Sequence, residues 1–205
     1  MKTRSVICIV MAAAMIVLLA SCAAGSAGGV PSNLTGTPEE ILTQLVDDLT
    51  NAGVKMPMSL PPTEVIADQS QNTIGLSEAD FGRLVSSAWY NLAAIGTFAH
   101  QIIMIRANDA AAAAEVKRLV SGENGYDAKK WICVFPDKAA AVDSGEYVLL
   151  VASYNEVVDA VLETFEAAAG NVGDVITFWE FAGGETDNGG FGGGMDLMPM
   201  DLELD

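Results

Sequence analysis

Residues 146–152 (EYVLLVA) constrain the fold more than any other stretch of this sequence. The run is almost continuously apolar and has the length of a single strand. A strand with apolar side chains on both sides must be covered on both faces, because water would otherwise reach one of them. The sequence therefore predicts that these residues form a central strand, with other elements packed above and below it.

The segments around this strand alternate between strand-like and helix-like patterns. Runs of apolar and β-branched residues predict strands at residues 83–90, 100–106, 139–142 and 146–152. The last two flank a hairpin-turn signal, Asp143-Ser144-Gly145. Apolar residues at helical spacing predict one helix from Asn108 or Asp109 to Val120 and another that ends at Gly170.

The order of these elements is β-β-α-β-β-α, which predicts an α+β domain with helices packed on a mainly antiparallel sheet. A further, N-terminal helix is expected to pack on the same sheet. It begins with a capping box formed by Thr37 and Glu40, and Gly53 ends it. Ser153 and Glu156 predict a second capping box, at the start of the last helix.

Three shorter segments lie outside this pattern. Residues 56–62 (MPMSLPP) are predicted to form an irregular, extended link, because prolines interrupt regular structure there. Residues 174–181 (DVITFWEF) are predicted to add an edge strand. Residues 131–135 (WICVF) fit either a strand or the buried side of a short helix.

The first residues are typical of a targeting segment. Lys2 and Arg4 are followed by an uncharged apolar run, residues 6–20, which is shorter than the about 20 residues that span a bilayer. The run ends in Leu19-Ala20-Ser21-Cys22, which resembles the lipobox of bacterial lipoproteins. We therefore expect cleavage before Cys22 and acylation of its thiol. The alternative is an ordinary secretory signal in which Cys22 is incidental.

These patterns divide the chain into four parts. We expect a lipoprotein signal peptide at residues 1–21, a lipidated flexible tether at 22–36, the α+β domain at 37–181, and a Gly-rich acidic tail, predicted to be disordered, at 182–205. The lipid on Cys22 would anchor the domain to the outer face of a membrane, and no later segment is apolar enough to span one.

The charge excludes some classes of partner. The net charge is −17 at pH 7, and removal of Lys2 and Arg4 with the signal lowers it to −19. Such a surface repels phosphate backbones and anionic lipid headgroups, so we expect no nucleic-acid partner. The domain is not expected to lie flat on a membrane.

Few residues could carry catalysis. Cys8 leaves with the signal and Cys22 takes the lipid, so Cys133 has no intramolecular partner and is predicted to be a buried core thiol. His100 is the only histidine, so any triad-like mechanism would need it. We predict instead that it is a strand-edge residue with one satisfied ring nitrogen, and we assign no catalytic residue and no cofactor.

The methionines and the tail offer two further hypotheses. Thioethers at suitable spacing can bind Cu(I), and the candidates are Met56, Met58, Met195, Met198 and Met200. The alternative is a disordered tail that happens to contain methionine. Acidic and apolar residues alternate near the C-terminus (MDLMPMDLELD), as in segments that fold on a partner, although a merely solubilising end is about as consistent.

A set of motifs in a fixed order resembles a known family. The set comprises the lipobox, the IIMIRA strand with Glu115-Val116-Lys117 after it, Trp131 before Phe135-Pro136-Asp137, the GEYVLLV strand, and an amphipathic helix with Phe165. It resembles a family of small lipoproteins, common in anaerobic Gram-positive bacteria, that is known only as a domain of unknown function. The likeness covers residues 74–169, and His100 departs from it.

The resemblance implies the fold, a location at the cell envelope and a helix across residues 131–135, but it brings no catalytic residues. We therefore predict a membrane-anchored extracytoplasmic lipoprotein, a non-catalytic module that binds a protein partner or a small ligand at the envelope. The alternative is a copper-handling lipoprotein that uses the tail methionines. An enzyme would require His100 beside a serine or a carboxylate in a pocket.

Overall fold

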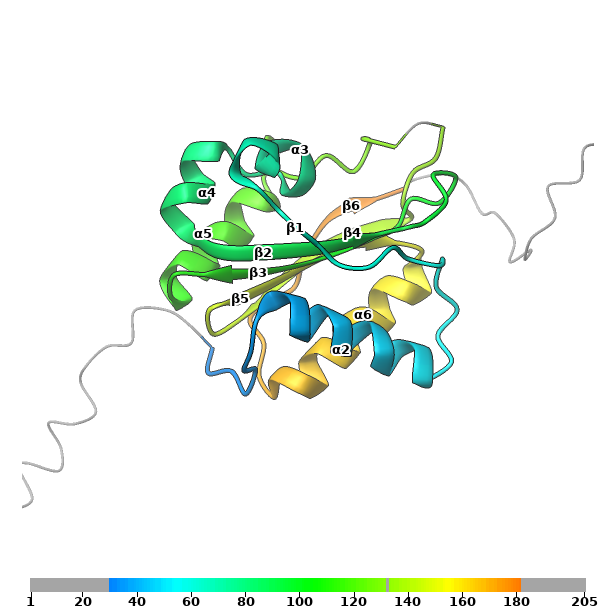
Figure 1. The fold of residues 1–205 in the computed structure, drawn as a ribbon, viewed down its shortest axis with the longest axis horizontal. Helices are drawn as coiled ribbons and strands as arrows, with labels where there is room; N and C mark the ends of the chain where they lie inside the picture. The colour runs from blue at the N-terminus through cyan, green and yellow to red at the C-terminus, as the bar shows by residue number, and fades with distance from the viewer. Residues whose placement is uncertain (1–29, 132, 182–205) are drawn as a thin grey trace, which may run out of the picture.

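The computed structural model describes residues 30–131 and 133–181, which form an antiparallel six-stranded sheet with helices on both faces (Figure 1). The strands are β1 (Thr63–Glu64), β2 (Val85–Leu92), β3 (Gln101–Ala107), β4 (Lys138–Ser144), β5 (Tyr147–Ser153) and β6 (Ile176–Glu180). Their order in the sheet is β1-β2-β3-β5-β4-β6. The predicted α+β fold with a mainly antiparallel sheet is confirmed, and so is the β-β-α-β-β-α order from β2 onward.

The helices divide into two layers. They are α2 (Pro38–Asn51), α3 (Ser70–Ile74), α4 (Glu78–Leu84), α5 (Ala110–Val120) and α6 (Asn155–Ala169), and a short 3-10 turn, η2 (Ala67–Gln69), precedes α3. In Figure 1, α2 and α6 cover one face of the sheet, and α3, α4 and α5 cover the other. Within the described residues, no helix combines the length and the apolar character needed to cross a bilayer.

Strand β5 is the central strand that the sequence predicts. It pairs with β3 on one side and β4 on the other, and each of its residues is buried. Its side chains alternate between the two faces: Val148 and Leu150 join the core under α3–α5, whereas Leu149 and Val151 join the core under α2 and α6. This alternation explains why both sets of positions had to be apolar.

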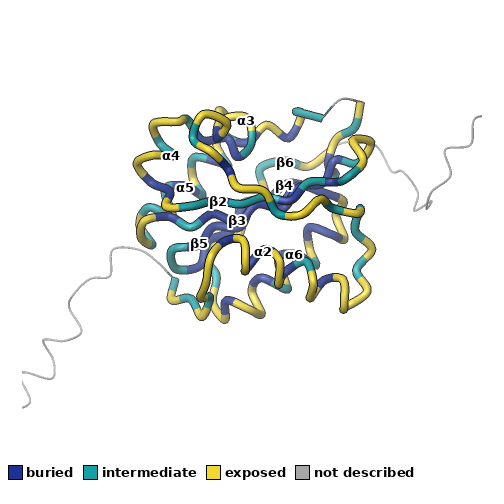
Figure 2. The backbone as a smooth tube through the Cα atoms, viewed as in Figure 1, coloured by how far each residue is buried: buried dark blue, intermediate teal, exposed yellow. Residues whose placement is uncertain are grey.

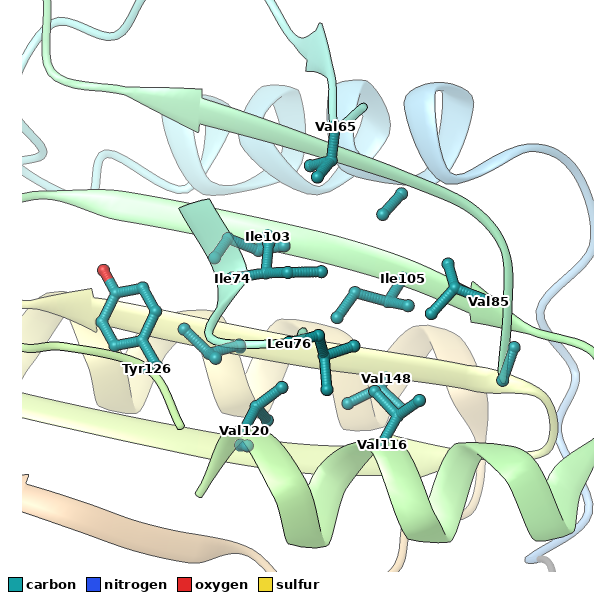
Figure 3. Close-up of a cluster of buried hydrophobic side chains, with 14 of the residues drawn as sticks. Val65, Ile74, Leu76, Val85, Ile103, Ile105, Val116, Val120, Tyr126 and Val148 are labelled. Carbon is teal, nitrogen blue, oxygen red and sulfur yellow. The ribbon is translucent and has the colours of Figure 1, made fainter. Parts of the chain in front are cut away.

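The two cores are separated by the sheet. Figure 3 shows the core under α3–α5, where Ile103 and Ile105 of β3 meet Val116 and Val120 of α5. On the other face, Leu42 of α2 is among the fully buried side chains. In Figure 2, buried residues follow the inner strands β3, β4 and β5 and the inner sides of the helices, and exposed residues follow the outer sides.

Local capping signals have mixed outcomes. Thr37 Oγ1 accepts from the Glu40 N–H (3.2 Å) and Glu40 Oε2 accepts from the Thr37 N–H (2.8 Å), so the first capping box is confirmed. Asp109 caps α5, also as predicted. The second capping box is wrong: Tyr154 is the N-cap of α6 and makes no side-chain cap. Ser153 instead ends β5, and its hydroxyl is engaged by a distant side chain described below.

The hairpin between β4 and β5 is tighter than predicted. Ser144 pairs with Tyr147, so the turn consists of Gly145 and Glu146 while Asp143 stays within β4. Gly145 has a φ of 58°, a conformation that glycine adopts without strain.

The described residues of the segment 131–135, namely 131 and 133–135, form neither the predicted helix nor a strand. The backbone has a φ of 65° at Cys133, and Pro136 restricts the residue before it to extended conformations. Both features are incompatible with a helix through this segment. Cys133 is exposed, so its prediction as a buried core thiol is wrong as well.

The N-terminal described residues pack against the domain. Gly145 N–H donates to the Val30 carbonyl (2.8 Å), Asn33 N–H donates to the Ala169 carbonyl (2.9 Å), and Tyr147 OH donates to the Gly36 carbonyl (2.8 Å). These bonds join the segment to the β4–β5 turn and to the end of α6. The predicted flexible tether therefore does not extend through residues 30–36, and its earlier part lies outside the described residues.

Strand β6 pairs with β4 at the end of the sheet, so the predicted edge strand is confirmed. Trp179 lies opposite Ala139 and Thr177 opposite Ala140, which leaves Phe178 as the extra residue of a β-bulge. Phe178 and Trp179 both pack on the core under α3–α5. The bulge thus lets two neighbouring rings cover the same face of the sheet.

Candidate binding groove

A surface groove of about 470 Å³ runs between α2 and the link that follows it. We call it the α2 groove. It is lined by Thr43, Val46, Asp47 and Thr50 of α2, by Val54 and residues 56–62 of the link, and by Asn91 of β2. Its volume lies within the about 300–1,000 Å³ that is usual for ligand sites. Most of the lining is apolar, and few polar groups reach it.

The link forms one wall because it runs along β2 in an extended conformation, as predicted. Leu60 N–H donates to the Leu92 carbonyl (2.8 Å), and Ala94 N–H donates to the Met58 carbonyl (2.7 Å). The prolines at positions 57, 61 and 62 prevent a helix here and carry no N–H. The link therefore presents mainly side chains and proline rings to the groove.

Asn91 is the buried polar residue of the α2 groove. It faces the α2 side of the sheet opposite Ile102, and it is 2 % exposed. Its Oδ1 accepts from the Ile102 N–H at 3.2 Å, which fixes the orientation of the amide. No described residue accepts a hydrogen bond from its Nδ2. The side chain is otherwise enclosed, so its unpaired Nδ2 is available to a ligand at the groove surface.

One charged residue among those described, Asp47, lines the α2 groove. Helix α2 carries four carboxylates, at Glu39, Glu40, Asp47 and Asp48, and no basic residue. Asp47 lines the groove near the C-terminal end of the helix, where the helix dipole is negative and a cation is favoured. Within the described residues, no ion pair neutralises any of these four carboxylates.

Two other grooves lack an unused buried donor. In a groove of about 460 Å³ between α2 and α6, Gln44 Nε2 donates to Asp48 (2.8 Å) and Glu40 serves the helix cap. In a groove of about 310 Å³ beside α5, Arg118 is bound to Glu115. Because these polar groups are paired within the chain, the α2 groove is the better candidate for a ligand site.

The structure places His100 beside a serine, but away from these grooves. Its Nδ1 lies 2.9 Å from Ser153 Oγ, and both residues are fully buried, at the adjoining ends of β3 and β5. Burial lowers the pKa of His100 to about 4, so the ring is neutral at pH 7. One ring nitrogen is satisfied, as predicted, and no described residue pairs with Nε2. Neither residue lines any of the three grooves.

On the α3–α5 side of the sheet, one lysine lies among polar and aromatic partners that the sequence did not predict. Lys130 Nζ donates to Gln101 Oε1 (2.6 Å) and to the Thr73 carbonyl (3.0 Å), and it lies 4.2 Å from the ring centroid of Tyr126. Burial lowers the pKa of Lys130 to about 7. The only local signal was a glutamine, Gln101, at the start of an apolar strand. These bonds attach the segment after α5 to α3 and β3.

The other predicted site residues have separate outcomes. Cys22, the predicted lipidation site, lies outside the described residues, and so do Met195, Met198 and Met200. Met56 and Met58 both line the α2 groove. In residues 30–131 and 133–181, no three His, Cys, Asp or Glu side chains are grouped so that they could hold a metal ion.

Comparisons with protein-family models, with curated proteins and with solved structures give no match to this chain. The resemblance to the family of small lipoproteins therefore rests on the sequence motifs alone and stays a prediction.

Proposed function

We propose that this chain is a lipid-anchored, non-catalytic binding module on the outer face of the cell membrane, attached through Cys22, and that it holds its ligand in the α2 groove. One observation carries the binding part of the proposal. Asn91 is buried at an apolar concave surface and keeps two amide hydrogens that no described residue uses. Ligand sites combine an apolar lining with a few such placed polar groups.

The position of the groove agrees with attachment at the N-terminus. The first described residue, Val30, is bonded to Gly145 in the β4–β5 turn. Asn91 lies at the opposite end of the sheet, where it pairs with Ile102 near the start of β3, and it lines the groove together with the C-terminal half of α2. An anchor ahead of Val30 would hold the domain by the turn and leave the groove facing away from the membrane.

The non-catalytic part of the proposal is supported by the burial of His100 and Ser153. A nucleophile and a base must reach a substrate as well as each other. These two side chains meet each other but are fully buried, with no groove beside them among those described above.

Copper handling is the second candidate, and one observation favours it. Met56 and Met58 bring two thioethers to the same groove. Titration of Cu(I) against the full chain and a Met56→Leu/Met58→Leu variant separates the two functions. An equal affinity of both proteins for Cu(I) would exclude a metal site in the groove.

The anchor and the groove are tested separately. Full-length chain expressed in a bacterial host should be recovered in the membrane fraction with lipid on Cys22, and Cys22→Ala should be released.

For the groove, amide-side-chain NMR signals of Asn91 are followed while a library of small apolar amides and short peptides is added. Thr50→Trp, at an exposed groove position, should abolish the shifts. Gln44→Trp, exposed on the same helix but in the neighbouring groove, should leave them unchanged. Shifts that survive Thr50→Trp would rule out the α2 groove.

A further inference from the structure

We propose that the occupant of the α2 groove is an extended segment of another envelope protein, with basic side chains next to apolar ones. This inference rests on the proposed binding function of the groove and names its partner class. It follows from three features of the groove: exposed apolar side chains, an amide donor at the base, and the carboxylate of Asp47, which forms no ion pair among the described residues.

The apolar contacts come from the link. Met58 is 72 % exposed and Leu60 is 49 % exposed, and both line the groove beside the half-buried Met56 and Val46. Methionine side chains adapt to varied partners because they are unbranched and polarizable. An apolar side chain of a bound segment would remove this surface from water, which is the main favourable contribution in such grooves.

The unused NH2 group of Asn91 favours a ligand that offers a hydrogen-bond acceptor, such as a main-chain carbonyl of a bound segment. Asn91 Oδ1 is already used by Ile102, so the group that Asn91 offers to a ligand is the NH2 of its amide. Extended peptides carry carbonyl groups that point sideways from the chain and are free to accept such a bond. A new strand could not reach β2 at this point, because the link is already hydrogen-bonded to Leu92 and Ala94 and includes Pro61 and Pro62. The segment would therefore lie over the link and be held by a side-chain amide.

The charge decides between basic and acidic segments. Asp47 lines the groove and Asp48 follows it, both near the negative end of the α2 dipole, and α2 carries no cation. A lysine or arginine beside Asp47 would offset this charge. The chain's own C-terminal segment contains Asp196, Asp201, Glu203 and Asp205 and no basic residue, so it would be repelled. The complementary partner is a basic segment of a different protein.

The test compares three synthetic peptides that differ only in charge. Their sequences are Lys-Leu-Val-Leu-Lys, Gln-Leu-Val-Leu-Gln and Glu-Leu-Val-Leu-Glu, each blocked at both ends and carrying the same uncharged fluorophore. Fluorescence anisotropy is measured with the full chain in neutral detergent micelles. We expect the lysine peptide to bind most tightly and the glutamate peptide least, with a difference that shrinks as salt is raised.

Two neighbouring carboxylates provide the matched variants. Asp47→Asn and Asp48→Asn make the same change of charge on adjacent residues, but only Asp47 lines the α2 groove, whereas Asp48 is bonded to Gln44. Asp47→Asn should weaken the lysine peptide about two- to five-fold, the range for an exposed ion pair, and Asp48→Asn should weaken it less. Thr50→Trp should abolish binding of all three peptides.

The outcomes separate this inference from the proposed function. If all three peptides bind equally and Thr50→Trp blocks each of them, the groove is a binding site but the charge inference is wrong. If the lysine peptide binds Thr50→Trp as well as the unaltered chain, it binds elsewhere and the partner inference is overturned, whereas loss of the Asn91 shifts is what decides the proposed function of the groove. If no peptide binds while small amides still shift the Asn91 signals, the groove takes a small ligand and the partner inference is overturned.

Discussion

Lys117 Nζ of α5 lies 2.5 Å from Asp143 Oδ1 of β4, and the two side chains are only 13 % and 6 % exposed. Lys117 also donates to the Asp174 carbonyl at 2.8 Å. One side chain thus connects a helix, an inner strand and the segment that leads into β6. Two buried charges that compensate each other become costly when either is left alone.

Replacing Lys117 alone should therefore destabilise the protein strongly. We expect Lys117→Met to lower the free energy of unfolding by about 3–5 kcal/mol, because Asp143 keeps a buried charge without its partner. The double variant Lys117→Met/Asp143→Leu should recover much of this loss. Urea denaturation followed by circular dichroism measures both.

Arg118→Met is the matched control for this change. Arg118 is the next residue of α5 and pairs with Glu115 at an exposed site, where an ion pair contributes about 0–1 kcal/mol. Equal losses for Lys117→Met and Arg118→Met would show that burial of the Lys117–Asp143 pair has no energetic consequence.

His100 should make the fold sensitive to mild acid. Its pKa is about 4 in the folded chain, because burial disfavours the imidazolium, and about 6.5 when the chain is unfolded. Between these values the unfolded chain binds the additional proton, so the free energy of unfolding falls as the pH drops from about 6.5 to 4 and the effect levels off below that.

Replacement of His100 by a residue that does not titrate should remove this dependence of the free energy of unfolding on pH. His100→Gln should be less stable than the unaltered chain at pH 7, because a well-packed buried residue is altered, yet its stability should vary less between pH 6.5 and 4. Urea denaturation at a series of pH values gives both curves. Parallel curves over that window would contradict the assignment of the slope to His100.

Lys130 should make the free energy of unfolding depend on pH in the alkaline range. Its pKa is lowered to about 7 by burial and is about 10.5 in the unfolded chain, so the unfolded chain binds more protons between these values. The free energy of unfolding should rise with pH from about 7 to 10. Above pH 10 the trend should reverse, because burial raises the pKa of Tyr126 and the unfolded chain then loses the tyrosine proton more readily.

Two adjacent lysines allow this prediction to be checked. Lys130→Met should flatten the rise between pH 7 and 10, whereas Lys129→Met, at an exposed neighbouring position, should retain it. Chemical denaturation over this pH range is the measurement. A rise that persists in Lys130→Met would assign the alkaline behaviour to another group.

Thiol titration tests Cys22 and Cys133 together. Cys133 is exposed, so it should react promptly with an aromatic disulfide reagent in the native protein. If Cys22 carries its lipid through a thioether, the denatured mature chain should show one reactive thiol. Two thiols would mean that Cys22 is unmodified, and Cys133→Ser should reduce either count by one.

The sequence predicted best where a structure depends on neighbours along the chain. The Thr37–Glu40 capping box and the apolar strand around Leu149 involve residues close in sequence, and both formed as expected. Ser153 carries an equally good capping signal. His100 lies beside it in the folded sheet and engages its hydroxyl, a contact that no local pattern contains.

The candidate site was largely beyond the reach of sequence patterns for the same reason. Asn91 stands within a strand and has no motif around it. Its significance comes from α2 and from the link that passes beside β2, and both are distant from it in sequence. Cys133 was misplaced because its apolar neighbours suggested burial, whereas the positive φ at Cys133 turns the chain there.

The contacts of the N-terminal segment also have a mechanical consequence. Tension that arrives from the N-terminal side reaches the domain through the bonds of Val30, Asn33 and Gly36 before it reaches α2. Those bonds meet the β4–β5 turn and the end of α6, so a modest pull would detach a few peptide groups and lengthen the connection while the sheet stays intact. The N-terminal segment would detach before the sheet does, and its hydrogen bonds would form again when the tension is removed.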